Sequence, residues 1–248
     1  MTKFSVFIPA RYHSTRLPGK PLLDIAGKPM IYHVWQRAIA SGADSVFIVT
    51  DDQRIHDVAK GFSAKVLLTS TAHLSGSSRI IEAVTALNVA AKEIVVNVQG
   101  DEPLIPPQVI RQVAENLAAA KDCAMATLAH PLSCLEEVHS PHVVKVVFDC
   151  RGRALYFSRS AIPWRKNAEP EHYYRHIGIY SYRVSCLRQW KNFPPSQLQH
   201  LEDLEQLTPL WQGVPIHVGL IKQSLPPGVD TQQDLASVRK HFDLACQS

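Results

Sequence analysis

Short apolar runs alternate with stretches of helical spacing along the first half of the chain. Buried strands are predicted over residues 4–9, 45–50, 65–69 and 94–98. Apolar side chains at helical spacing predict helices over residues 30–39, 54–61, 77–87 and 106–120. Strands that alternate with helices of about 10 to 15 residues are typical of a parallel sheet covered on both faces. We therefore expect an α/β fold with a mostly parallel, doubly wound, Rossmann-like sheet.

The alternation changes after residue 123, where strands follow one another with short connections. These strands are predicted over residues 125–128, 143–148, 154–157 and 177–182. A helical segment at 201–211, a strand at 216–221 and a helix to about residue 246 follow. Because no linker or internal repeat interrupts the chain, we expect one domain over residues 1–248. A mixed or antiparallel subdomain should be inserted at about 130–182.

Composition narrows the classes of partner. The chain has 248 residues, 46% of them hydrophobic and 19% charged, with a formal net charge of +4. Its cations gather at residues 11–28, 151–166 and 183–191. Proteins that bind nucleic acid usually cluster basic residues more densely. The pattern favours a small anionic ligand and gives no reason to expect nucleic acid as a partner.

The expected location is the cytoplasm. No apolar run approaches the roughly 20 residues that a bilayer requires, so we expect no membrane association. The first residues lead directly into a strand and lack the features of a signal peptide. The five cysteines are scattered and form no CxxC pair, which fits reduced thiols better than a zinc ribbon or a disulfide frame.

Three cations lie in the loop that joins the first expected strand to the first expected helix. They are Arg11, Arg16 and Lys20, and prolines and glycines surround them. Arginine offers a planar fork of donors to phosphate, and lysine supplies a compact charge. The loop therefore predicts a cradle for a triphosphate, although neither GxxxxGK[ST] nor GxGxxG is present. The alternative is a solvated basic loop without a ligand.

Carboxylates follow the expected strands at the edge where such sheets bind ligands. Asp51 follows the second expected strand, and Asp101 follows the strand at 94–98. By itself Asp101 could be a turn or helix-capping aspartate, and the same holds for Asp230 before Thr231.

Eight motifs, in one order, carry a resemblance that covers essentially the whole chain. They are PARYHSTRLPGKPL at 9–22, VTDD at 49–52, HLSGSSR at 73–79, NVQGDEPLI at 97–105, YFSRSAIPW at 156–164, RHIGIYSYR at 175–183, LEQL at 204–207 and GVDTQQDL at 228–235. The set closely resembles the sugar-acid cytidylyltransferases. RHIGIY and GVDT narrow the resemblance to the branch that uses 3-deoxy-manno-octulosonate (Kdo), the CMP-Kdo synthetases. It implies a nucleotidyltransferase-type sheet.

The resemblance also implies roles for particular residues. The implied nucleotide-binding residues are Arg11, Arg16, Lys20, Ser75, Gly76, Arg79 and Gln99. The implied sugar-acid-binding residues are Gln99, Arg159, His176, Tyr180, Glu205 and Gln206. Asp101 and Asp230 match the family's ligands for Mg²⁺, a cofactor that suits two carboxylates and phosphate oxygens. Arg11, Lys20 and Asp101 are the implied catalytic residues. Lys145, which could be a strand-edge lysine, is left outside the site.

The implied reaction transfers CMP from CTP to Kdo and releases pyrophosphate, as a step of lipopolysaccharide biosynthesis. The 2-hydroxyl of the sugar acid attacks the α-phosphate in line, so positioning and charge neutralisation supply the catalysis. No general base can be named with support from the sequence, and Asp101 is the nearest candidate. Members of the family are usually homodimers, so the resemblance implies a homodimer here.

Several positions depart from the family pattern. Ala72 replaces an aspartate, Leu74 a glutamine and Ser78 an acidic residue, while Lys166 and Thr208 replace an arginine each. These changes leave the true sugar acid open. The alternatives are 8-amino-3,8-dideoxy-manno-octulosonate, a sialic-type acid, or a paralogue that binds nucleotide or sugar acid without turnover.

Overall fold

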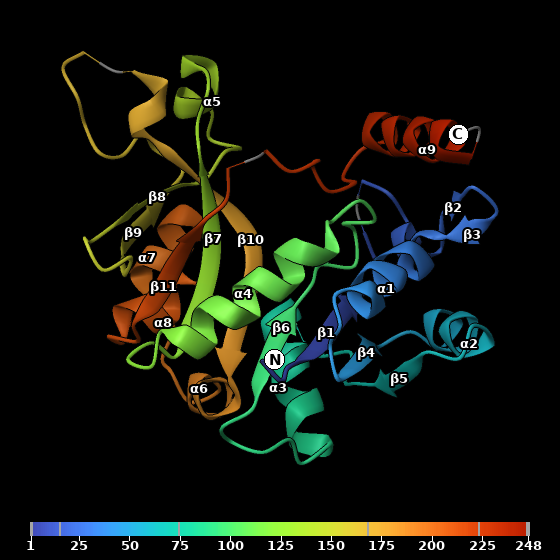
Figure 1. Ribbon diagram of the computed structural model, residues 1–248. Coiled ribbons are helices and arrows are strands. Elements are labelled where there is room, and N and C mark those ends of the chain that lie inside the picture. The colour runs from blue at the N-terminus through green and yellow to red at the C-terminus, as the bar shows by residue number, and fades with distance from the viewer. Residues whose placement is uncertain (1, 15, 74, 168, 223, 247–248) are drawn as a thin grey trace. The chain divides into compact units, whose positions relative to one another are not determined.

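The computed structural model describes residues 2–14, 16–73, 75–167, 169–222 and 224–246. The chain forms two compact units. The first unit contains Met1–Gln112 and Leu225–Ser248, and the second contains Val113–Ser224. Figure 1 shows the helices and strands of both units. The expected insertion at about 130–182 within one domain is not tested by this division and stays a prediction.

A parallel sheet forms the centre of the first unit. Its strands are β1 (Ser5–Ala10), β4 (Ser45–Thr50), β5 (Lys65–Leu68) and β6 (Ile94–Asn97), in the order β6-β1-β4-β5. The connecting helices are α1 (Met30–Ala40), α2 (Gln53–Gly61) and α3 (Gly76–Ala86). Because crossovers between parallel strands are right-handed, the reversal of strand order after β5 puts α3 on the face opposite α1 and α2. The strand order therefore reverses beside β1, with β4 on one side of it and β6 on the other.

The C-terminal segment packs against the loop that follows β1. This loop leads into a 3₁₀ turn (Lys20–Leu22) and the short hairpin of β2 (Asp24–Ile25) and β3 (Lys28–Pro29). The last helix, α9 (Gln232–Cys246), belongs to the same unit. A shared apolar cluster contains Leu17, Ile25, Met30, Val229, Leu235 and Val238. Burial of these side chains brings the GVDT segment beside the first loop.

The second unit contains a mixed sheet. Its strands are β7 (Met125–Pro131), β8 (Lys145–Phe148), β9 (Ala154–Ser158), β10 (Tyr174–Arg183) and β11 (Ile216–Leu220). Strand β10 runs antiparallel to β7 and β8, β9 runs antiparallel to β8, and β11 runs parallel to β7. The helices are α5 (Leu135–His139), α6 (Val184–Trp190), α7 (Gln197–Glu202) and α8 (Leu207–Trp211), and a 3₁₀ turn covers Pro170–His172. Helix α4 (Pro107–Ala119) spans the end of the first unit and the start of the second.

The expected α/β class and mostly parallel sheet are confirmed. The single helical segment over 201–211 is wrong, because Asp203 adopts a left-handed conformation (φ 52°) that ends α7. Residues 203–206 therefore form a connection between α7 and α8, and this connection carries Glu205 and Gln206. Helices α5 and α6 were not predicted. Among the described residues, no helix combines the length and the apolar character needed to cross a membrane.

Candidate active site

The loops that follow β1 and β6 enclose a pocket of about 410 Å³ in the first unit. Gly100 permits this arrangement, because a Cβ atom there would lie only 2.8 Å from the carbonyl oxygen of Pro9. Ligands of such sheets bind beyond the carboxyl ends of the strands, where the strand order reverses. The lining residues are Pro9, Ala10, Arg11, His13, Ser14, Arg16, Lys20, Pro21, Gly76, Gln99, Gly100, Asp101 and Asp230.

One lysine and two aspartates meet in this pocket. The Nζ atom of Lys20 donates to Oδ2 of Asp101 at 2.7 Å and to Oδ1 of Asp230 at 3.0 Å. It also donates to the carbonyl oxygen of Val229 at 2.9 Å. Burial alone lowers the pKa of Lys20, but the two aspartates outweigh it and leave the pKa raised above 10.5. Lys20 is therefore charged at neutral pH, and the two carboxylates converge on one cation.

The loop that carries Asp230 is held by an aspartate at the start of α9. Oδ2 of Asp234 accepts hydrogen bonds from the backbone nitrogens of Asp230 and Thr231, at 3.0 and 2.8 Å. Arg16 forms a more exposed ion pair with Asp230 at 3.3 Å, with side chains that are 65% and 50% exposed. Asp230 thus faces two cations from the first loop.

Glu102 lies next to Asp101 in the QGDEP motif and differs from it in charge. Burial and the neighbouring charge of Asp101 raise the pKa of Glu102 to about 8. A carboxyl group with this pKa is mostly protonated at pH 7. Glu102 therefore adds little negative charge beside the two carboxylates that face Lys20.

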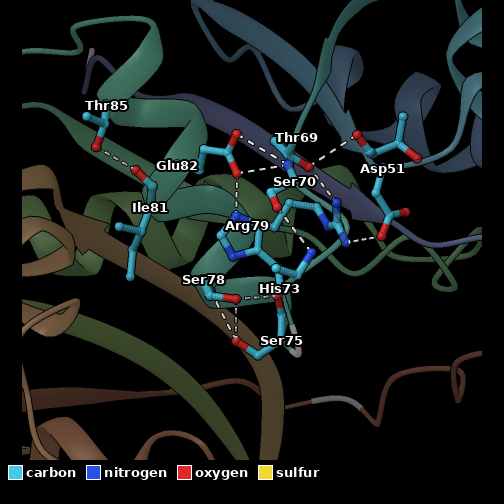
Figure 2. Close-up of polar contacts among 12 residues, drawn as sticks. Asp51, Thr69, Ser70, His73, Ser75, Ser78, Arg79, Ile81, Glu82 and Thr85 are labelled. Carbon is cyan, nitrogen blue, oxygen red and sulfur yellow. Dashed lines mark hydrogen bonds and ion pairs between the residues drawn. The ribbon is translucent and has the colours of Figure 1, made fainter.

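Figure 2 shows that Arg79, in the first turn of α3, extends to residues that follow β4 and β5. Its Nη1 donates to Oγ1 of Thr69 at 2.5 Å, and its Nη2 donates to Oδ2 of Asp51 at 2.6 Å. The Arg79 side chain is 0% exposed, and its Nε is buried without a partner among the described residues. The guanidinium therefore ties α3 to two strand ends. Nε and one N–H group on each Nη atom remain for the predicted nucleotide contact.

Ser75 caps α3 and keeps the predicted nucleotide loop in place. Its Oγ accepts from the backbone nitrogen of Ser78 at 3.1 Å, and the Ser78 hydroxyl donates to the Ser75 carbonyl at 3.0 Å. His73 contacts Glu82, which also accepts from the backbone of Ser70 at 3.0 Å (Figure 2). Ser78, which departs from the family pattern, thus forms part of the helix cap. Leu74 lies outside the described residues.

In the second unit, His176 and Tyr180 lie together on β10. Their ring centroids are 5.3 Å apart, and Phe157 packs edge-on against His176 at 5.0 Å. Thr127 Oγ1 donates to backbone carbonyls and lies 3.0 Å from His176 Nε2, so the network assigns the proton of the neutral ring to Nε2. Burial lowers the pKa of His176 to about 3, with a smaller effect from the charge of Arg175. His176 is therefore neutral, with Nδ1 as an acceptor.

Two predicted sugar-acid residues carry buried polar atoms without partners among the described residues. These atoms are the hydroxyl of Tyr180 and Nε2 of Gln206, and the residues are 7% and 6% exposed. Buried polar groups nearly always have hydrogen-bond partners, so such atoms need an explanation. Glu205, next in the chain to Gln206, is exposed.

Arg159, at the end of β9, already makes several bonds. Its Nε donates to the carbonyl of Glu202 at 2.7 Å and its Nη1 to the carbonyl of Pro141 at 2.9 Å. Its Nη2 lies 3.4 Å from the carbonyl of Asp203. A guanidinium has five N–H donors, so one remains on each Nη atom for a ligand.

The sequence left open that Lys145 lies at a strand edge, and the structure places it inside the sheet instead. Strand β8 pairs with both β9 and β10, and Lys145 is 0% exposed. Its Nζ donates to the carbonyl of Arg159, which connects it directly to a predicted site residue. The only signal in the sequence was a lysine within the apolar run VVKVV.

The other departures from the family pattern have local roles. Thr208 is 4% exposed and its hydroxyl bonds to Gln199, so it is an internal contact between α7 and α8. The backbone of Ala72 donates to Ser70 Oγ at 3.1 Å, and the side chain of Lys166 is exposed.

Comparisons with known proteins identify the family of the chain. A family model described as "Cytidylyltransferase" matches residues 5–217. The chain is 52% identical to a 3-deoxy-manno-octulosonate cytidylyltransferase of Idiomarina loihiensis, over 96% of this chain and 97% of that protein. It is 54% identical to the protein of the same name from Vibrio vulnificus, with the same coverage. A solved CMP:2-keto-3-deoxy-manno-octonic acid synthetase complexed with CTP is 41% identical and superposes with a TM-score of 0.92, covering 98% of this chain and 99% of that one. The chain therefore belongs to the cytidylyltransferase family, in the branch of the 3-deoxy-manno-octulosonate cytidylyltransferases.

Proposed function

We propose that the chain catalyses Mg²⁺-dependent transfer of CMP from CTP to Kdo, with release of pyrophosphate. The observation that carries this proposal is the convergence of Lys20, Asp101 and Asp230 in one pocket beside β1 and β6. A pocket with cations and two carboxylates suits a metal–triphosphate ligand better than an uncharged one. The solved relative complexed with CTP supports the same nucleotide here.

Asp101 and Asp230 would hold the metal ion. The ammonium group of Lys20 serves as a stand-in cation, because it lies within 3.0 Å of a carboxylate oxygen from each aspartate. Carboxylate oxygens are the donors that Mg²⁺ prefers, so the residues fit this ion. When bound, Mg²⁺ would neutralise charge on the phosphates and orient them.

The residues of the first loop and of α3 would bind CTP. Arg11 and Lys20 would donate to the phosphates, and Arg16 would support them from its more exposed position. Gly76, the first residue of α3, also lines the pocket, so the N-terminus of this helix would face the phosphates. Ser75 would position the helix as its cap.

The transfer itself requires positioning more than covalent catalysis. The 2-hydroxyl of the sugar acid would attack the α-phosphate in line and pass its proton to Asp101, the nearest candidate base, while pyrophosphate leaves. Lys20 and Arg11 would stabilise the charge that accumulates on the leaving group. Such interactions act mainly on kcat when they strengthen in the transition state.

The second unit would bind the sugar acid. Kdo offers several hydroxyl groups, which could satisfy the unpartnered atoms of Tyr180 and Gln206 and the acceptor Nδ1 of His176. The two remaining N–H groups of Arg159 would bind the carboxylate of the sugar acid. Glu205 is a further proposed contact of this unit, and Gln99, which lines the pocket of the first unit, is a proposed contact outside it.

We also propose that the chain forms a homodimer and acts in the cytoplasm. The reaction that it catalyses there would be a step of lipopolysaccharide biosynthesis. Support for a second copy comes from apolar side chains that the second unit exposes. Trp164 is 83% exposed, Leu201 82%, Leu155 61% and Trp211 56%. Light scattering after size-exclusion chromatography measures the oligomeric state directly.

Pyrophosphate release with CTP, Mg²⁺ and Kdo tests the proposed reaction. We expect turnover that requires all three, and a large loss of kcat in Arg11→Ala. Lys65→Ala is the matched control, because Lys65 is an exposed cation of the same unit outside the pocket. No turnover with Kdo, 8-amino-3,8-dideoxy-manno-octulosonate or a sialic acid would favour a protein that only binds. Preferred turnover of one of the other acids would correct the substrate.

A further inference from the structure

Lys145 is a buried cation whose three hydrogen bonds all go to backbone carbonyls. Its Nζ donates to Ser140 at 2.9 Å, Val143 at 2.6 Å and Arg159 at 2.5 Å. Only a protonated ammonium group has three N–H donors, so this geometry describes the charged form. None of the three acceptors is a carboxylate, although buried charges are usually paired with an opposite charge.

The acceptors of Lys145 and Arg159 belong to the same two segments. Lys145 joins the turn at residues 140–143 to the backbone of Arg159. The Arg159 guanidinium donates to the carbonyl of Pro141 in the same turn. The backbone nitrogen of Arg159 donates to Oε2 of Glu202 at 2.8 Å. Lys145 thus fixes the Arg159 backbone from one side, and Glu202 fixes it from the other.

The cluster has more positive than negative charge. Lys145 and Arg159 are the cations, and Glu202 is the carboxylate that acts on both. Burial lowers the pKa of Lys145, and the charge of Glu202 opposes that shift. The Glu202 carboxylate already accepts from the Ser158 hydroxyl at 2.6 Å as well as from Arg159. A second carboxylate would therefore balance the cluster.

We propose that Lys145 is a positioning residue for the sugar acid. It holds the backbone of Arg159 so that the two free N–H groups of this arginine meet the carboxylate of the substrate, and its charge adds to the attraction. Lys145 does not touch the ligand itself, because all three of its N–H groups are donated to the protein. This inference rests on the proposed function, in which Arg159 binds the sugar acid.

The test compares Lys145→Met, Lys145→Gln and Arg159→Ala by steady-state kinetics with Kdo and CTP. In both Lys145 variants we expect the KM for Kdo to rise by about tenfold to a hundredfold, the size of a lost charge-assisted hydrogen bond. The KM for CTP should change by less than about twofold, since the proposed CTP contacts lie in the first unit. A merely structural role would not separate the two KM values.

Arg183→Met is the matched control. Arg183 also donates to three backbone carbonyls of the second unit, those of Cys123, Leu117 and Ala120. It lies eight residues along β10 from Arg175, the partner of Lys145 in the sheet, or about 26 Å at the usual rise per residue. Arg183→Met should lower the melting temperature and leave the KM for Kdo unchanged.

The double variant Lys145→Gln/Arg159→Ala shows whether Lys145 acts through Arg159. We expect little further rise in the KM for Kdo beyond that of Arg159→Ala, because the positioned group is already gone. A full additional rise would overturn the proposal, as would unchanged KM values in the single Lys145 variants. If Arg159→Ala itself leaves the KM for Kdo unchanged, the sugar-acid site of the proposed function is the part that fails.

Hydrogen exchange on the unaltered chain gives an answer that does not depend on the folding of any variant. Kdo should slow amide exchange over residues 140–145 and 158–160, which Lys145 and Arg159 join. Unchanged exchange there, with Kdo bound as measured by calorimetry, would contradict the positioning role.

Discussion

Asp51→Asn should destabilise the first unit far more than the same change at the next residue. The substitution removes the negative partner of Arg79 (Figure 2), and the Arg79 side chain is 0% exposed. Breaking a buried ion pair on one side costs about 3–5 kcal/mol, because a charge is left buried without its partner. The Asp51 side chain is 16% exposed, and Arg79 keeps its bond to Thr69, so we expect the lower end of this range.

A loss of about 3 kcal/mol lowers the melting temperature of a chain of this size by about 6–12 °C. Circular dichroism during heating and urea titration measures this change. The KM for CTP should also rise, because Arg79 ties α3 to the sheet and Gly76 of that helix lines the pocket.

Asp52→Asn is the control. Asp52 follows the same strand and pairs with Arg54, but that side chain is 55% exposed. Exposed pairs contribute about 0–1 kcal/mol, and asparagine caps a helix about as well as aspartate, so the control should cost less than about 1 kcal/mol. Equal costs for the two variants would refute the reasoning. Adding Arg79→Met to Asp51→Asn should recover part of the loss, because no unpaired charge then remains buried.

Three further predictions concern the pocket and the histidine of β10. Asp101→Asn and Asp230→Asn should each fold normally and lose several orders of magnitude in turnover, and wild-type-like rates at limiting Mg²⁺ would remove that residue from the proposed metal site. Lys20→Ala should lower kcat by about tenfold to a few hundredfold. Arg16→Ala should have a smaller effect, because the ion pair of Arg16 is exposed. Unaltered steady-state kinetics in Lys20→Ala would reject the phosphate cradle. The pKa of His176 is about 3 in the folded chain, whereas that of an unfolded histidine is near 6.5. The contribution of neutral His176 to the free energy of unfolding should therefore be fully present above pH 6.5 and be lost as the pH falls toward 3. Urea midpoints at pH 7 and 5 should differ less in His176→Gln than in the unaltered chain, and an equal difference would show that His176 is not the cause.

The sequence by itself determined the alternating architecture and the polar edge of the sheet. Periodicity separates strands from helices, and the side chains that follow β1 and β6 must lie at the carboxyl edge of any parallel arrangement. The motifs by themselves predict that Arg11, Lys20 and Asp101 lie at this edge. Local spacing carries this information, because it depends only on neighbours along the chain.

Only the tertiary structure decided which distant groups meet. Asp230 is 210 residues from Lys20 in the chain, and burial of the apolar cluster around Leu17 and Val229 is what brings them within 3.0 Å. For the same reason, the sequence could not distinguish Lys145 from a strand-edge lysine. Its burial depends on β8 pairing on both sides, and its acceptors are backbone carbonyls, which every residue has and no side-chain pattern reveals.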